Sequence, residues 1–375
     1  MRIFGIRLNL ILRFTDYSIS PNFVLKIKDK SECRWDLVSL GEVMLRFDPG
    51  DERIHTARTF RVWEGGGEYN VARNIAKCFR QRAAIITALA DNQLGRLVED
   101  LIQQGGVDVS EIVWRQTDGI GRNVRNGMYF MERGFGVRPP TGCSDRGNTA
   151  VSQLKPGDVD WTIIFAEKST RWFHTGGIFA GLSETTSQVA SEAMRAAKEN
   201  GVVVSYDLNY RDSLWADRGG RDAANAVNRE LLEYVDVVFG VEGFHASLAD
   251  FPEEAFRRAA GEMFERHPHL KIAATTLRDI KSASRHDLGG VCFAGDETAR
   301  AIEFIDLEVL DRVGSGDAFA AGFVYGLLSG SDPQRSINLA VASAALSLAS
   351  LGDGSSATLP EIERLAEGSH RGAFR

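Results

Sequence analysis

The sequence is poor in cysteine, and the few cysteines it has lie far apart. Its 375 residues include four, Cys33, Cys78, Cys143 and Cys292. No two of them form a Cys-x-x-Cys pair, so the sequence predicts neither a disulfide framework nor a zinc site. Because free cysteines are stable in a reducing compartment, we expect a cytoplasmic protein.

Long apolar runs and a positive net charge are also missing. No stretch reaches the roughly 18 to 20 apolar residues that cross a bilayer, and the apolar residues 3–14 are interrupted by Arg7 and Arg13, unlike a signal peptide. The formal net charge is −7, whereas surfaces that bind nucleic acids or anionic membranes are basic. We therefore expect no nucleic-acid partner and no membrane partner.

Length and composition are those of a globular chain. Hydrophobic residues make up 43% of the sequence and charged residues 25%, which suffices for one large α/β domain or two smaller ones. Residues 1–34 do not continue the pattern of the rest. We interpret them as a poorly ordered N-terminal extension.

Residues 306–323 contain a glycine-rich turn between a strand-like stretch and a helix-like stretch. Gly314 and Gly316 allow the backbone to turn its N–H groups toward a ligand, and the start of the helix adds N–H donors and a positive dipole end. Asp317 follows at once. A carboxylate repels phosphate, but it can accept the proton of a hydroxyl group that is held beside a phosphate.

Other glycine-rich sites have different spacings. A dinucleotide-binding fingerprint requires a third glycine where Phe319 stands, and a Walker loop requires Gly-Lys-Ser/Thr, which the chain lacks. A turn followed by an aspartate helix cap is the structural alternative for this motif taken by itself.

The stretch 306–323 resembles the signature of the carbohydrate kinase family that includes ribokinase, the PfkB family. The resemblance implies that Asp317 is the catalytic base and that the backbone N–H groups of Gly314, Ser315 and Gly316 form an anion hole. It covers about residues 36–367. It implies an α/β fold, a ribokinase-like three-layer α/β/α sandwich with a mostly parallel central sheet.

The order of strand-like and helix-like stretches agrees with this fold class. Short apolar runs at 36–42 and 83–90 are typical of buried strands, and strands alternate with helices from residue 171 onward, as in βαβ units. Residues 43–64 and 120–150 alternate in polarity. We expect these two segments to form a small β-sheet lid.

A second turn, with three consecutive glycines, precedes another helix-like stretch. The resemblance implies that Gly66, Gly67 and Asn70 bind sugar hydroxyls there, with a plain loop and helix cap as the alternative. Glu42 stands at the carboxyl end of the first buried strand, where open α/β sheets bind their ligands. We expect Glu42 and Tyr129 to contribute to the substrate site as well.

Two segments resemble the 2-keto-3-deoxygluconate kinases within this family. Residues 143–150 include Arg146, and residues 207–211, Asp-Leu-Asn-Tyr-Arg, end in Arg211. A guanidinium group can engage both oxygens of a carboxylate. Two arginines directed at one pocket favour an acidic sugar; a solvated side chain is the alternative for the first, and a structural ion pair for the second.

The resemblance further implies ATP and Mg²⁺ as ligands. Nucleotide contacts are expected from Thr276, Gly314, Gly316 and Asp353, and a monovalent ion, K⁺, is expected near Asp311.

One segment departs from the family pattern. An Asn-x-x-Glu motif that organises magnesium and phosphate is replaced by Val-Glu-Gly-Phe at 241–244, which leaves Glu242 as the candidate metal ligand. This departure motivates one alternative, a kinase-fold protein that binds a sugar but phosphorylates it weakly or not at all.

The first hypothesis is ATP-dependent phosphorylation of a sugar acid at a primary hydroxyl, namely 2-keto-3-deoxygluconate to its 6-phosphate. A kinase of a neutral ketose or pentose, such as fructose or ribose, is the second. A NAD-dependent dehydrogenase fits the α/β pattern but fails at Phe319. Because lid strands in this family often pair between subunits, the resemblance also implies a homodimer formed through the lid.

Overall fold

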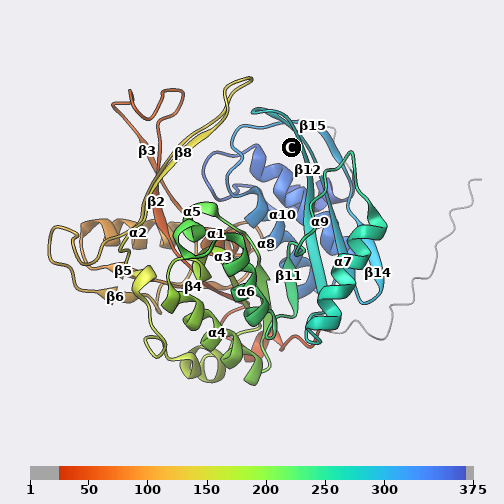
Figure 1. Cartoon of the computed structure of the whole chain (residues 1–375), viewed down its shortest axis with the longest axis horizontal. Helices are drawn as coiled ribbons and strands as arrows, with labels where there is room; N and C mark the ends of the chain where they lie inside the picture. Colours follow the sequence, from red (N-terminus) through yellow and green to blue (C-terminus); the bar gives the residue numbers. More distant parts are fainter. Residues whose placement is uncertain (1–24, 369–375) are drawn as a thin grey trace, which may run out of the picture.

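The computed structural model describes residues 25–368, and its centre is a nine-stranded sheet (Figure 1). The order is β14-β13-β12-β11-β10-β9-β1-β4, with β15 paired to β13. Strands from β4 to β12 are parallel to their neighbours, whereas β13 is antiparallel to β12, β14 and β15. The strands are β1 (Leu37–Leu40), β4 (Ala83–Ile86), β9 (Trp172–Gly176), β10 (Val203–Asp207), β11 (Val237–Phe239), β12 (Ile272–Ser282), β13 (Arg285–Ala294), β14 (Glu297–Arg300) and β15 (Phe304–Glu308).

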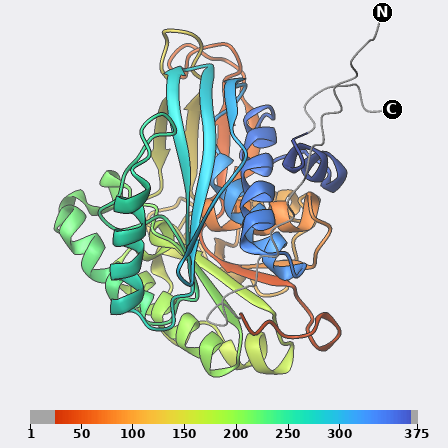
Figure 2. The ribbon, with the colours of Figure 1, turned by 90° about the vertical axis from the view of Figure 1, so that its right-hand side faces the viewer.

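Helices pack on both faces of this sheet, which confirms the three-layer α/β/α prediction (Figure 2). Because successive side chains of a strand point to opposite faces, Leu37 belongs to one core and Val38 to the other. The first core is covered by α1 (Gly67–Lys77), α8 (Ser315–Leu328), α9 (Pro333–Leu348) and α10 (Leu359–Ala366). The second is covered by α4 (Glu184–Glu199), α6 (Gly220–Leu232) and α7 (Glu253–Arg266).

The remaining helices are short or peripheral. They are α2 (Gln93–Gln104), α3 (Gly177–Ala180), α5 (Asp212–Trp215) and the single turns η1 (Lys30–Glu32), η2 (Val151–Gln153), η3 (Ile163–Glu167) and η4 (Ala216–Arg218). No helix in residues 25–368 has the length and apolar content that crossing a membrane requires.

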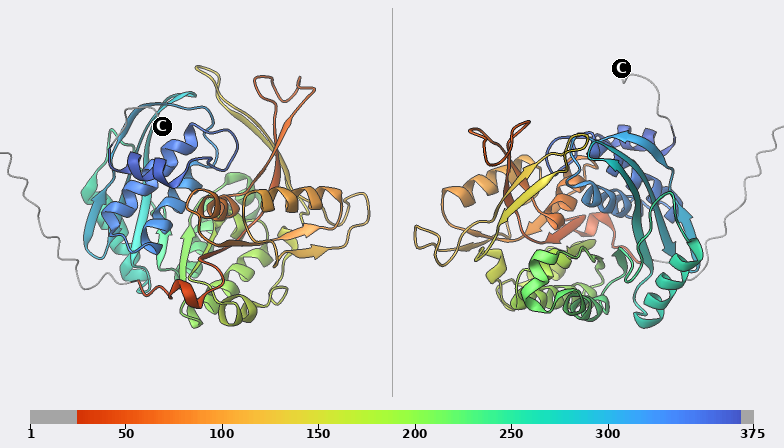
Figure 3. Two further views of the ribbon diagram at one scale, coloured as in Figure 1. Left: turned by 180° about the vertical axis from the view of Figure 1, so that it is seen from behind. Right: turned by 45° about the horizontal axis from the view of Figure 1, so that its top comes forward.

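A separate four-stranded sheet stands beside the main one, at the segments predicted to form the lid. Its order is β3-β2-β7-β8, and it projects beyond the main sheet (Figures 1 and 3). The strands are β2 (Met44–Asp48), β3 (Arg61–Gly65), β7 (Met128–Glu132) and β8 (Thr141–Asp145). Phe47 stacks on Phe130 at 4.9 Å between ring centroids, and Phe60 meets both edge-on, so the lid has an aromatic cluster of its own.

The single strand predicted over 83–90 is two strands. β4 continues the main sheet, whereas β5 (Ala88–Ala90) pairs with β6 (Val113–Arg115) in a two-stranded sheet. The division falls at Thr87, whose carbonyl accepts a hydrogen bond from the Val113 N–H at 2.9 Å. An apolar run cannot reveal this change of partner, because both strands are equally buried.

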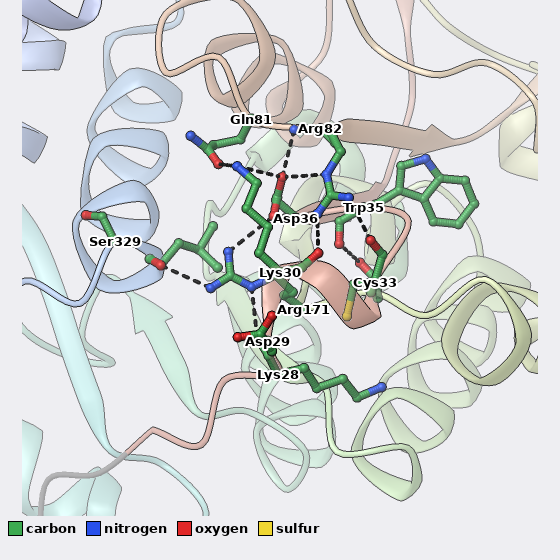
Figure 4. A network of polar contacts seen from close by, with 12 residues as sticks. Lys28, Asp29, Lys30, Cys33, Trp35, Asp36, Gln81, Arg82, Arg171 and Ser329 are labelled. Carbon is green, nitrogen blue, oxygen red and sulfur yellow. Dashed lines mark hydrogen bonds and ion pairs between the residues drawn. The ribbon is translucent and has the colours of Figure 1, made fainter.

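The N-terminal boundary also differs from the prediction. Residues 25–34 belong to the folded domain, while the rest of the predicted extension lies outside the described residues. Arg82 donates to the carbonyls of Lys30 and Cys33, both at 2.8 Å, and Arg171 donates to the carbonyl of Lys28 at 2.9 Å (Figure 4). The same two arginines pair with the buried carboxylate of Asp36, and this network fixes the segment to the domain.

Candidate active site

A cavity of about 680 Å³ lies beside the carboxyl ends of the parallel strands and under the lid. This is where open α/β sheets bind their ligands. Its lining draws on the lid, on the starts of α1 and α8, on the end of β10 and on the middle of β12. The predicted site residues that line it are Gly66, Gly67, Asn70, Tyr129, Arg146, Arg211, Thr276, Gly314, Ser315, Gly316, Asp317 and Asp353.

Asp317 lies in the first turn of α8, and its Oδ2 accepts a hydrogen bond from Asn70 Nδ2 at 2.7 Å. Burial raises the pKa of Asp317 well above its usual value, and the nearby carboxylates of Asp207, Asp353 and Glu68 raise it further, while the Asn70 bond lowers it. An aspartate with a raised pKa is a stronger base once it is deprotonated.

The turn before α8 has the backbone geometry of an anion hole. Gly314 precedes the helix with φ 78°, and a Cβ atom there would lie 1.8 Å from the carbonyl oxygen of Asp353. Only glycine fits that conformation and that approach. The first N–H groups of α8, which begin at Ser315, have no acceptor within the helix, and they are available to an anion in the cavity.

Another part of the cavity wall is formed by the start of α1 and by two arginines. Gly66 caps α1 where a Cβ atom would lie 1.8 Å from the Glu42 carbonyl oxygen. Arg146 and Arg211 line this wall, and among the described residues no carboxylate lies within 4.0 Å of the Arg211 guanidinium.

Glu42, predicted as a substrate ligand, does not line the cavity. Its side chain is only 1% exposed, and its Oε2 accepts from Arg146 Nη2 at 2.5 Å. The carboxylate therefore supports the arginine and orients it. The position of Glu42 at the strand end agrees with the prediction, but its side chain lies outside the cavity lining and pairs with Arg146.

A buried arginine connects the lid to two loops beside the turn before α8. Arg46 of β2 is fully buried, and its guanidinium donates to Asp311 at 2.5 Å and to Asp353 at 2.7 Å. Asp48 lies 3.8 Å away, and the Tyr129 hydroxyl donates to the other oxygen of Asp353.

This network changes the interpretation of Asp311. The residue was predicted to hold a monovalent ion, but it does not line the cavity, and its carboxylate is already compensated by the guanidinium of Arg46. In a strand of alternating polarity, the sequence pattern predicts that an arginine is exposed. The role of Arg46 as the partner of Asp311 was missed for this reason.

Glu242 is not brought to the cavity either. It follows β11 and pairs with Arg229 of α6 and, at 3.2 Å, with Arg266 of α7. These two arginines hold the pKa of Glu242 below its usual value despite partial burial, which acts in the opposite direction. In residues 25–368 no cluster of three or more His, Cys, Asp or Glu side chains could hold a metal ion.

The residues that line the cavity without having been predicted as site residues include Asp207, Asn209, Arg278 and Arg312. The first two stand at the carboxyl end of β10, a position that was a usable signal. Burial raises the pKa of Asp207 to about 6, although Asn209 and Arg211 act to lower it. Nothing in the local sequence distinguishes the two arginines from surface residues.

The chain matches a known family over most of its length. Residues 35–243 and 284–360 match the pfkB family of carbohydrate kinases. The chain belongs to this family. The kinase and fold predictions are thereby confirmed, and the dehydrogenase alternative is wrong.

Individual relatives of this pfkB family kinase align over nearly their full lengths. The chain is 30% identical to 2-dehydro-3-deoxygalactonokinase of Haloferax volcanii over 91% of its own length and 99% of the relative's. It is 26% identical to 5-dehydro-2-deoxygluconokinase of Clostridium perfringens, over 89% and 92%. The crystal structure of 2-dehydro-3-deoxygluconokinase from Thermotoga maritima superposes with a TM-score of 0.79 at 33% identity, covering 88% of this chain and 99% of that one.

Proposed function

We propose that this pfkB family kinase transfers the terminal phosphoryl group of ATP to a primary hydroxyl of a sugar acid, giving the 6-phosphate of 2-keto-3-deoxygluconate. The observation that carries the proposal is that Arg146 and Arg211 both line the cavity that contains Asp317 and the start of α8. Among the described residues Arg211 has no carboxylate within 4.0 Å, whereas Arg146 pairs with Glu42. An arginine without a protein carboxylate partner, as Arg211 is, suits the carboxylate of an acidic sugar and gains little from a neutral one. The names of the relatives agree with an acidic substrate.

The reaction needs few groups, because phosphoryl transfer depends mostly on positioning and charge stabilisation. The sugar hydroxyl, held by Gly66, Gly67 and Asn70, donates its proton to Asp317. Its oxygen forms a bond to the γ-phosphorus, while the bond between that phosphorus and the bridging oxygen breaks and leaves its electron pair on ADP. The N–H groups at the start of α8 stabilise the charge on the transferring group.

We assign the nucleotide to Thr276 and Asp353, which line the same cavity as the turn before α8. Mg²⁺ is bound in such sites largely by phosphate oxygens and water. The described residues offer no preformed carboxylate cluster for it. We therefore assign no step to a protein-bound metal, and Glu242, with its two arginine partners, is not a ligand in this proposal.

The lid supports a second, subordinate proposal, a homodimer. β8 forms one edge of the small sheet, and each of its residues is exposed. A free strand edge can pair with a second copy of the same edge. Light scattering at several concentrations would detect the dimer, and a monomer at all concentrations would contradict it.

The test of function is a kinase assay with separately offered substrates. ADP release from MgATP is measured with 2-keto-3-deoxygluconate, with its C4 epimer 2-keto-3-deoxygalactonate, with 5-keto-2-deoxygluconate, and with fructose and ribose. We expect turnover with a 2-keto-3-deoxy acid and its loss in Asp317→Asn, while the variant still binds the acid. Turnover with only a neutral sugar would overturn the substrate class and leave the role of Asp317 in place.

Arg211→Met provides the second arm of this test. If the guanidinium binds the substrate carboxylate, KM for the acid rises roughly tenfold or more, since a charge-assisted hydrogen bond contributes about 1.5–3 kcal/mol. Any slow side activity on fructose should be unaffected. A matched control is Arg285→Met, at an exposed surface ion pair outside the cavity. Equal effects of Arg211→Met on acidic and neutral sugars would contradict the proposed contact.

A further inference from the structure

Two arginines of the cavity lining, Arg278 and Arg312, have no carboxylate partner among the residues that the structure describes. Both line the cavity together with Thr276 and the anion hole. Among residues 25–368, no carboxylate oxygen lies within 4.0 Å of either guanidinium. Each has an aspartate next to it in the sequence, but Asp279 accepts from the N–H of Ala249 and Asp311 pairs with Arg46.

Arg278 is held against the first turn of α8. Its Nη2 donates to the Ser315 hydroxyl at 2.8 Å, and that hydroxyl donates to the carbonyl of Arg312 at 3.2 Å. Its Nε is buried and has no hydrogen-bond partner. Burial lowers the pKa of Arg278, and the charge of Arg312 lowers it further, as is typical of a cation that lacks a compensating anion.

The titratable groups beside these arginines in the described part of the chain do not neutralise the two charges. His286 is the neighbouring titratable group, and burial, followed by the charges of both arginines, lowers its pKa to about 4. It is therefore neutral at pH 7. Asp287, on the same strand, is engaged by Lys281 at 2.7 Å. Two like charges that face one hollow repel each other, and an anion between them would remove this cost.

We propose that Arg278 and Arg312 bind the β- and γ-phosphate groups of the nucleotide. Their charge would act beside the phosphates in a chain whose segment 241–244 lacks the magnesium-organising motif. The proposal rests on the proposed kinase function. During transfer, the bond from the γ-phosphorus to the bridging oxygen breaks, and its electron pair develops negative charge on ADP. The two guanidinium groups stabilise that charge while Asp317 receives the hydroxyl proton.

The experiment measures nucleotide binding, separately from turnover. Calorimetric titrations with β,γ-imido-ATP and with AMP are made on the full chain and on Arg278→Lys, Arg278→Met and Arg312→Met. Arg229→Met is the matched control, since that arginine pairs with Glu242 outside the cavity. Thermal melts accompany each variant, and because Arg312 is exposed, its substitution leaves the core untouched.

We expect each Met variant to bind β,γ-imido-ATP roughly tenfold or more weakly than the wild type, while affinity for AMP, which lacks the two outer phosphates, stays within about twofold. Arg278→Lys should retain part of the affinity, because it keeps the charge but loses the fork of donors. Equal losses for both nucleotides, or no loss for either, would overturn the proposal.

The two proposals fail separately. If the wild type phosphorylates a sugar acid and the Met variants bind β,γ-imido-ATP as tightly as the wild type, the kinase function is supported and phosphate binding by Arg278 and Arg312 is refuted. If the wild type phosphorylates no sugar acid, but the Met variants bind β,γ-imido-ATP selectively more weakly than the wild type, phosphate binding by the two arginines is supported and the proposed substrate class is refuted.

Discussion

Asn70 and Asp317 are joined by a hydrogen bond of 2.7 Å although 247 residues separate them in the chain. The bond connects the first turns of α1 and α8, so the two glycine-rich turns present their N–H groups to the same cavity. It also stabilises the charged form of Asp317, the proposed base, since a donor to a carboxylate lowers its pKa.

The first prediction concerns this donor. Asn70→Ala removes a contribution that lowers the pKa of Asp317, so the pKa rises and the acidic limb of the kcat/KM profile moves to higher pH. A pH–rate profile on both proteins checks it. An unchanged limb combined with lower kcat at all pH values would show that Asn70 only orients the substrate.

Asp207→Asn should shift the same limb in the opposite direction. Burial is the main reason that the pKa of Asp317 is high, and the charge of Asp207 adds to it. Removing that charge lowers the pKa of Asp317, and activity should therefore persist to lower pH than in the wild type. If the limb moves upward or stays unshifted, Asp207 does not act on the base through its charge.

Arg46→Met should destabilise the fold strongly. The substitution leaves the buried carboxylates of Asp311 and Asp353 without their cation, and loss of one partner of a buried pair costs roughly 3–5 kcal/mol. Urea denaturation measures the change in free energy of unfolding. The control is Arg285→Met at an exposed pair, where about 1 kcal/mol or less is expected. Similar losses for the two variants would contradict a structural role specific to Arg46.

Glu68→Gln should make stability less sensitive to pH. Burial raises the pKa of Glu68 to about 7 from an ordinary 4.5, although hydrogen bonds from its own backbone N–H and from the Phe179 N–H, the latter at 3.0 Å, act to lower it. A raised pKa means that the folded state binds the proton more tightly, so this contribution is complete below about pH 4.5 and is lost as the pH rises through 7.

The neutral glutamine avoids that loss and can still accept from the Phe179 N–H. The difference in melting temperature, Glu68→Gln minus wild type, should therefore become more positive between pH 5 and pH 8. Each unit by which the pKa differs between the folded and unfolded states corresponds to about 1.4 kcal/mol in the free energy of unfolding. Melting curves across this range measure it. A difference that does not change with pH would mean that Glu68 is not the group that titrates.

Sequence reasoning located the parts of the site that depend on backbone chemistry. Gly314, Gly66 and Asp317 are recognisable because a tight turn before a helix admits few residue types, and those types recur at fixed spacing. The lid and the layered sheet followed from polarity alternation and from the order of elements.

What the sequence could not show is which charges meet. Glu42 was expected to face the substrate, but it pairs with Arg146, and Asp311 was assigned an ion where Arg46 is found. Arg278 and Arg312 were not predicted as site residues, because the sequence does not distinguish a solvated arginine from a paired one or from one that lines a cavity without a partner. Such pairings depend on contacts between segments that are hundreds of residues apart, and local patterns carry no information on them.

The position of Arg46 has a consequence for exchanging parts between relatives. The lid is not an independent module, because one of its strands supplies the counterion for acidic residues in two loops of the main domain. A chimera that receives a foreign lid to alter sugar preference would inherit a mismatch of buried charge beside the phosphate-binding turn. Arg46, Asp311 and Asp353 would have to be transplanted as a set.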